Sequence, residues 1–168
     1  MNFLKEKFYN PTQGYLSFDQ VIEELKKYLI EKPEETYDLI VGCDSSSDRE
    51  PSFPVVIVAL RKGQGGRFFL KKISYKNRKF YNWKERILEE IYLSCQLALS
   101  LKEVFEKELD KSLTKFNYDF RYIHADIGEN GKTKDMIKEV VGLIKSNGFE
   151  AKIKPESYAA SVVADRYT

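Results

Sequence analysis

The sequence contains few cysteines and no long hydrophobic run. Its only cysteines, Cys43 and Cys95, lie far apart and form neither a CxxC pair nor a zinc-binding spacing. They give little support to a disulfide framework or a thiolate zinc site. No apolar run approaches the roughly 18 residues of a membrane-spanning helix, and the first ten residues lack the features of a signal peptide. We therefore expect a cytoplasmic protein that does not bind a membrane.

The chain also lacks a strong charge of either sign. It has 28 Lys and Arg against 26 Asp and Glu among 168 residues, a net charge of +2. So small an excess does not identify a nucleic-acid-binding protein, although a basic face can lie opposite an acidic site. The length and the 42% hydrophobic content are typical of one ordinary domain, which can bury a core without metals or disulfides.

The N-terminal part predicts an arm followed by a helix. Residues 1–16 contain turn-forming residues and are expected to form an irregular arm. Ser17 is the expected N-cap of a helix that runs to about Glu31 with apolar residues at helical spacing. Residues 1–35 are thus predicted to pack on the core, and residues 36–168 to form the main domain.

The remaining chain predicts alternating strands and helices. The continuous apolar run that ends at Asp44 is typical of a strand buried on both faces. The order implies an α/β fold with a mixed five-stranded sheet, three antiparallel strands and then a βαβα unit, with helices on both faces. The expected elements are strands at 38–44, 53–61 and 67–75, a helix at 82–110, a strand at 118–126, a helix after GENGKT that closes at Asn147-Gly148, a strand at 149–154 and a last helix from Pro155.

Acidic residues occupy the ends of two of these strands. Asp44 ends the most apolar strand, and Asp126 ends the strand at 118–126. Ligands of such sheets gather outside the carboxyl ends of neighbouring strands. Two carboxylates placed there repel each other unless a cation is bound between them. If the two strands are adjacent, the pair indicates a cation site.

Two further acids on helices complete a set of four. At about 100° per residue, Glu90 falls within the apolar stripe of the long helix and Glu89 lies outside it, so Glu90 is preferred and Glu89 is the alternative. Asp165 lies in the last helix beside Val162 and Val163. Four carboxylates suit two Mg²⁺ or Mn²⁺ ions, which can clamp the attacking and leaving oxygens of a phosphodiester. The predicted chemistry is phosphoryl hydrolysis.

Several motifs resemble a known family. The order of elements, with an acid at these four places, resembles the ribonuclease H-like superfamily. More closely, VGCDSSS, HADIGENGKTK, PESYAASVVADRYT and the pattern Arg86-x3-Glu90-x3-Ser94 resemble the bacterial ribonuclease H-like family of unknown function. The resemblance covers about residues 36–168.

The resemblance implies a role for each acid. Asp44 would bridge both ions, Asp126 would hold one ion, Asp165 would hold the second, and Glu90 would be the helix glutamate. The implied activity is that of a two-metal nuclease that uses Mg²⁺ or Mn²⁺ and acts on RNA, an RNA/DNA hybrid or another nucleic acid.

His124 is a further candidate for the site. It lies two residues before Asp126, and strand alternation places both side chains on the same sheet face. It is interpreted either as a catalytic residue that assists a water or holds a phosphate, or as a hydrogen-bonded structural histidine.

Basic residues near the predicted site are candidates for nucleic-acid contacts. Lys132 and Lys134 begin the helix after the second acid-bearing strand, and Arg78 and Lys79 belong to the stretch KKISYKNRKFYNWK. That stretch interleaves cations with aromatic rings, a combination that can follow a phosphate backbone and stack bases. An ordinary solvated surface, with the aromatic rings packed under the long helix, is the alternative.

Two other functions are considered. A non-catalytic nucleic-acid-binding module with the same fold is the main alternative to a nuclease. The segment GENGKT is similar to a phosphate-binding P-loop, but the full motif would require glycine at position 126, where this chain has Asp. A P-loop-like nucleotide hydrolase is therefore the less favoured alternative, and the sequence does not predict an oligomeric state.

Overall fold

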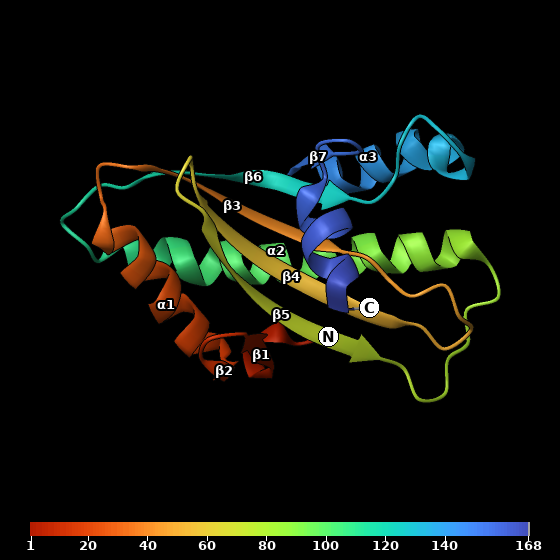
Figure 1. Ribbon diagram of the computed structural model, residues 1–168, viewed down its shortest axis with the longest axis horizontal. Coiled ribbons are helices and arrows are strands. Elements are labelled where there is room, and N and C mark those ends of the chain that lie inside the picture. Colours follow the sequence, from red (N-terminus) through yellow and green to blue (C-terminus); the bar gives the residue numbers. More distant parts are fainter. Residues whose placement is uncertain (168) are drawn as a thin grey trace.

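The computed structural model describes residues 1–167 and contains one mixed sheet in the order β2-β1-β5-β4-β3-β6-β7 (Figure 1). β3, β4 and β5 pair antiparallel, whereas β6 and β7 extend the sheet parallel to β3. The predicted α/β architecture is thus confirmed. The five strands of this part are β3 (Thr36–Cys43), β4 (Ser52–Arg61), β5 (Gly66–Ser74), β6 (Asn117–Ala125) and β7 (Glu150–Lys152).

The expectation of an irregular N-terminal arm is wrong. After a short 3-10 helix, η1 (Phe3–Lys5), the arm forms a hairpin of β1 (Lys7–Asn10) and β2 (Gly14–Ser17), and β1 pairs with β5. The sheet therefore has seven strands instead of five. The Asn10 side chain holds this hairpin together, because its oxygen accepts two turn N–H groups while its amide donates to the Phe68 carbonyl of β5 at 3.0 Å.

Three α-helices cover one face of the sheet with a shared hydrophobic core. α1 (Phe18–Glu31) begins at Ser17 as predicted, where a capping box with Gln20 satisfies backbone N–H groups at the helix start. α2 (Trp83–Asp110) runs behind the sheet in Figure 1. The predicted helix after GENGKT is confirmed as the 3-10 helix η2 (Lys132–Met136) followed by α3 (Ile137–Ser146). No helix within residues 1–167 is long and apolar enough to cross a lipid bilayer.

The C-terminal segment covers the middle of the opposite face. It consists of η3 (Ala159–Ala164), a π-helix, and η4 (Asp165–Tyr167), a 3-10 turn, and it crosses in front of β3 and β4 in Figure 1. Its alanines pack against apolar residues of β3, β4 and β5 in a second, smaller cluster. Helices therefore lie on both faces, as predicted, although regular helical structure starts later than Pro155.

Gly42 allows the C-terminal segment to lie directly on β3. A Cβ atom at this position would stand 2.9 Å from the backbone nitrogen of Ala160 and 3.1 Å from the carbonyl carbon of Ala159. Any larger residue would push the segment away from the sheet. The close approach fixes the segment near the end of β3, where Asp44 follows two residues later.

Candidate carboxylate site

The two strands that carry the predicted acids are adjacent. Cys43 of β3 pairs with Ala125 of β6 in parallel register. Asp44 and Asp126 are the next residues of their chains, so both leave the sheet at the same carboxyl edge. Both side chains are partly buried. The adjacency on which the sequence argument depended is therefore confirmed.

Asp44 lies in the combined field of the three other predicted acids. Burial, followed by the charges of Glu90, Asp126 and Asp165, raises the pKa of Asp44 to about 8. A side-chain hydrogen bond between Asp44 and Asp165 adds to this rise. The structure thus brings acids from β3, β6, α2 and the C-terminal turn close enough to repel one another.

Glu90 approaches this edge from α2 and is buried. Its carboxylate accepts hydrogen bonds from the Ser45 backbone N–H at 2.9 Å and from the Ser45 hydroxyl at 2.6 Å. Burial raises the pKa of Glu90 to about 7, although the two bonds from Ser45 and the charge of Arg86 favour the ionised form. Arg86, one turn earlier, donates to the Ser46 carbonyl at 2.8 Å. Glu90 and Arg86 therefore hold the loop that follows Asp44.

Glu89 makes its contacts away from the Asp44 loop, and it is buried although it lies outside the predicted apolar stripe of the helix. It is buried because the connection between β5 and α2 covers it. It accepts a hydrogen bond from the Tyr75 hydroxyl and pairs with Arg78 at 3.0 Å. Arg78 also stacks over the Phe80 ring, with 4.4 Å to the ring centroid. Arg78 is therefore tied into the protein, whereas Lys79 is exposed.

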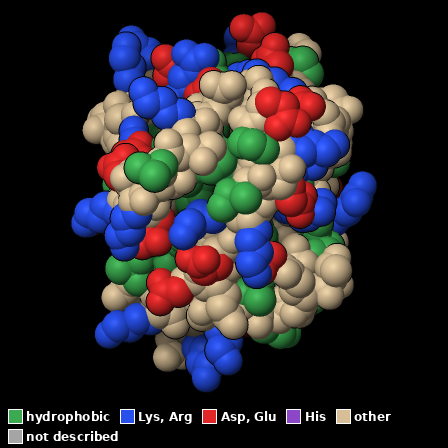
Figure 2. Space-filling view, turned by 90° about the vertical axis from the view of Figure 1, so that its left-hand side faces the viewer, with side chains coloured by type: hydrophobic (Ala, Val, Ile, Leu, Met, Phe, Trp, Pro, Cys, Tyr) green, Lys and Arg blue, Asp and Glu red, His purple; other side chains and the backbone are tan. Residues whose placement is uncertain are grey.

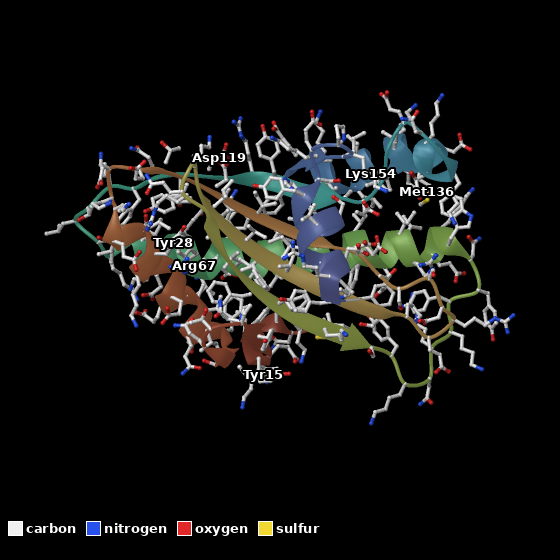
Figure 3. All side chains as sticks on the ribbon, viewed as in Figure 1. Tyr15, Tyr28, Arg67, Asp119, Met136 and Lys154 are labelled. Carbon is white, nitrogen blue, oxygen red and sulfur yellow. The ribbon has the colours of Figure 1, made fainter. Side chains whose placement is uncertain are left out.

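Asp126 has a cationic neighbour that sequence reasoning missed. Its Oδ1 lies 3.2 Å from Nζ of Lys154 without the geometry of a hydrogen bond, and this buried oxygen has no hydrogen-bond partner within residues 1–167. Lys154 stands beside the carboxyl end of β6 in Figure 3. It was hidden in the sequence because it follows β7, whose position next to β6 is a tertiary feature.

His124 is buried between the sheet and the C-terminal segment. Its Nδ1 accepts the backbone N–H of Ala159 at 3.1 Å, and its ring meets Tyr158 edge-on at 4.6 Å between centroids. Burial and the nearby charge of Lys152 lower the pKa of His124 to about 4. A neutral imidazole that accepts at Nδ1 carries its proton on Nε2. These contacts correspond to the structural interpretation of His124, as an anchor of the C-terminal segment.

The loop after β6 is closed by its own side chains. Thr133 Oγ1 accepts the N–H of Gly128 at 3.1 Å, and the chain enters a 3-10 helix instead of an α-helix. A P-loop instead presents free N–H groups to phosphate at the start of a helix, so this loop gives the P-loop interpretation no support. Lys132 lies over the ring of Trp83 at 5.2 Å, and Lys134 is exposed on the same turn.

The donor chemistry of the four acids suits a hard divalent cation, since every donor is a carboxylate oxygen. Within residues 1–167, however, no three His, Cys, Asp or Glu side chains are arranged to hold a metal ion as they stand. Three of the carboxyls instead interact with neighbouring protein groups. Asp44 interacts with Asp165, Glu90 accepts a hydrogen bond from Ser45, and Asp126 lies next to Lys154. The unbonded Asp126 oxygen, and the neighbouring charges that add to burial in raising the pKa of Asp44, are features whose repulsion a bound cation would relieve.

Comparisons with known proteins agree with this fold. The family model described as ribonuclease H-like matches residues 20–168. The chain is 32% identical over 165 residues to YkuK of Bacillus subtilis (strain 168), an uncharacterized protein, and the match covers 96% of each chain. No solved structure matches the chain significantly. The chain belongs to the ribonuclease H-like family, and this membership indicates a nuclease or another function related to nucleic acids.

Proposed function

We propose that this protein is a divalent-metal-dependent nuclease that hydrolyses phosphodiester bonds in nucleic acid. One observation carries the proposal: Asp44 and Asp126 leave paired strands at one edge, where burial, followed by the charges of Glu90, Asp126 and Asp165, raises the pKa of Asp44 to about 8. Such a concentration of negative charge costs folding free energy. A cation-dependent function explains why the fold tolerates it.

Each acid has a distinct position in this proposal. Asp44 would contact both ions, with Asp126 on one ion and Asp165 on the other. Glu90 would complete the set from α2 while its bonds from Ser45 keep the Asp44 loop in place. Bound Mg²⁺ or Mn²⁺ would supply a water of lowered pKa and positive charge for the leaving oxygen.

The basic residues around the edge would bind the substrate's phosphates. Lys154 lies 3.2 Å from Asp126, so it can contact the phosphate nearest to the scissile bond. Lys132, Lys134 and Lys79 are exposed and can reach phosphates further along the backbone. Arg78, paired with Glu89, would contribute through its half-exposed side chain.

The test is cleavage of labelled single-stranded RNA, single-stranded DNA, RNA/DNA hybrid and DNA junctions by the purified protein in Mg²⁺ or Mn²⁺. Asp44→Asn and Asp126→Asn should each reduce cleavage by about 100-fold or more, as expected for losing a charged group at the reacting centre. Glu90→Gln should also reduce cleavage, and Glu85→Gln is its matched control, because Glu85 is exposed on the same helix. Cleavage that survives in both aspartate variants would exclude this site as its origin.

A binding module that does not cut is the second candidate. It is favoured by one observation, namely that Asp44, Glu90 and Asp126 already contact protein groups. A gel shift run in parallel with the cleavage assay separates the two. Retention of a substrate that stays intact in both metals would favour the module.

A further inference from the structure

A hollow of about 660 Å³ lies on the sheet face that carries the C-terminal segment. Leu70 of β5 lies in this hollow, and its other linings include Tyr9 of β1, Tyr15 of β2, Tyr167 of the C-terminal turn, Lys7 and Lys72. We call it the tyrosine groove. It exists because the N-terminal hairpin extends the sheet beyond β5, while the C-terminal segment lies mainly over β3 and β4 and reaches β5 and β1 through Tyr167.

The three tyrosine rings of the groove and the adjacent Phe68 ring form a continuous row. The Tyr15 and Tyr9 centroids are 5.6 Å apart, those of Tyr9 and Tyr167 are 6.3 Å apart, and those of Tyr167 and Phe68 are 5.6 Å apart. Tyr15 is 74% exposed and stands at the outer margin of the sheet beside β1 and β2 (Figure 3). The other three rings are partly exposed. An open row of rings gives planar surfaces on which other planar groups can stack.

The charge of the groove is positive. Lys7 and Lys72 are exposed, and alternation along β1 and β5 places them on the same face as Tyr9 and Leu70. Neither lysine forms an ion pair within residues 1–167, and no acidic residue of that range lines the hollow. Lys71 also lines the hollow, but its charge is paired with Glu6 at 2.7 Å. The surface at the amino ends of β3 and β6 differs from the groove, because Lys and Arg side chains there lie among Asp and Glu side chains (Figure 2).

The groove adjoins the carboxylate site through one turn. Asp165, which bonds with Asp44, and Tyr167, which contacts Tyr9 and Phe68, belong to the same 3-10 turn. A ligand bound on Tyr167 would therefore lie beside the turn that carries Asp165. Since a duplex hides the faces of its bases, stacking on these rings requires an unpaired strand.

We propose that the tyrosine groove binds a single strand of nucleic acid, with bases stacked on Tyr9, Tyr15 and Tyr167 and phosphates held by Lys7 and Lys72. The part of this proposal in which the bound strand leads to the carboxylate site rests on the proposed function. The binding itself depends only on the rings and the lysines. Stacking of this kind tolerates any base, so we expect little sequence preference.

The test is fluorescence anisotropy with a labelled 12-nucleotide oligo-U, its oligo-dT counterpart and a blunt duplex of the same length, all in EDTA so that nothing is cut. Tyr15→Ala should weaken single-strand binding by about 5- to 100-fold, as loss of one stacked base predicts. The Lys7→Gln and Lys72→Gln double variant should reduce the slope of log affinity against log salt by about 1.4, or 0.7 for each phosphate contact. Tyr92→Ala is the control, because Tyr92 is half-exposed on α2, behind the sheet.

Two results would overturn the proposal. One is unchanged single-strand affinity in both Tyr15→Ala and the lysine variant, and the other is equal affinity for the duplex. Sedimentation of the same samples checks whether the groove instead joins two copies of the chain, in which case Tyr15→Ala would change the mass and leave the oligonucleotide affinity unaltered. Because no metal is present, failure here is separate from failure of the cleavage assay: a nuclease without this groove would still lose activity in Asp44→Asn.

Discussion

Asp44→Asn should stabilise the metal-free protein at alkaline pH. The substitution keeps the size of the side chain and removes the charge that conflicts with Glu90, Asp126 and Asp165. The folded-state pKa of Asp44 is raised from 3.8 to about 8, so the folded protein holds this proton more tightly than the unfolded chain does. Its contribution to stability is therefore complete below pH 4 and is lost as the pH rises through 8.

The size of the effect follows from the pKa shift. A rise from 3.8 to about 8 corresponds to an upper limit of roughly 6 kcal/mol at about 1.4 kcal/mol per pKa unit. Asp44 is only partly buried and the carboxyls can move apart, so we expect about 2 kcal/mol in practice. The variant should match the wild type near pH 4 and exceed its unfolding free energy by about 2 kcal/mol at pH 9.

The assay is urea unfolding in EDTA at several pH values and constant ionic strength. A second series with Mn²⁺ at pH 8 completes it, since an ion that binds only the folded state stabilises the wild type and should do little for the variant. Asp135→Asn, an exposed acid on η2, is the control. Equal pH dependence in wild type and Asp44→Asn, together with equal Mn²⁺ stabilisation, would refute the reasoning.

Two further predictions concern the C-terminal segment. Gly42→Ala should lower the unfolding free energy by about 1 to 3 kcal/mol in urea denaturation, because the new Cβ would meet the Ala160 backbone at 2.9 Å. The control is Gly142→Ala, which adds a Cβ in open space on α3 and should instead raise the unfolding free energy by up to about 1 kcal/mol. NMR titration of the single histidine should give a pKa near 4 for His124. The contribution of the neutral imidazole to stability is therefore present above pH 6.5 and lost as the pH falls through 4. A titration midpoint near 6.5 would contradict a buried imidazole that accepts a hydrogen bond.

The sequence by itself determined the main elements of the fold. Local periodicity is enough for these, because burial of one face repeats every two or about 3.6 residues within a single element. The Ser17 cap, the long helix α2 and the apolar strand before Asp44 were all readable in this way. The N-terminal hairpin was not, since its strands of four residues are too short for a clear period and depend on pairing with β5.

For the candidate site, the sequence placed Asp44 and Asp126 at strand ends, and the tertiary structure decided how their neighbours converge. The burial of Glu89 depends on a connection that folds over α2, and the approach of Lys154 to Asp126 depends on the position of β7. Likewise, Tyr9 and Tyr167 come from opposite ends of the chain and meet only through the sheet. Periodicity reports which face of an element is buried, whereas charge interactions and hydrogen bonds depend on distances across the fold. Those distances are set only when all the elements pack together.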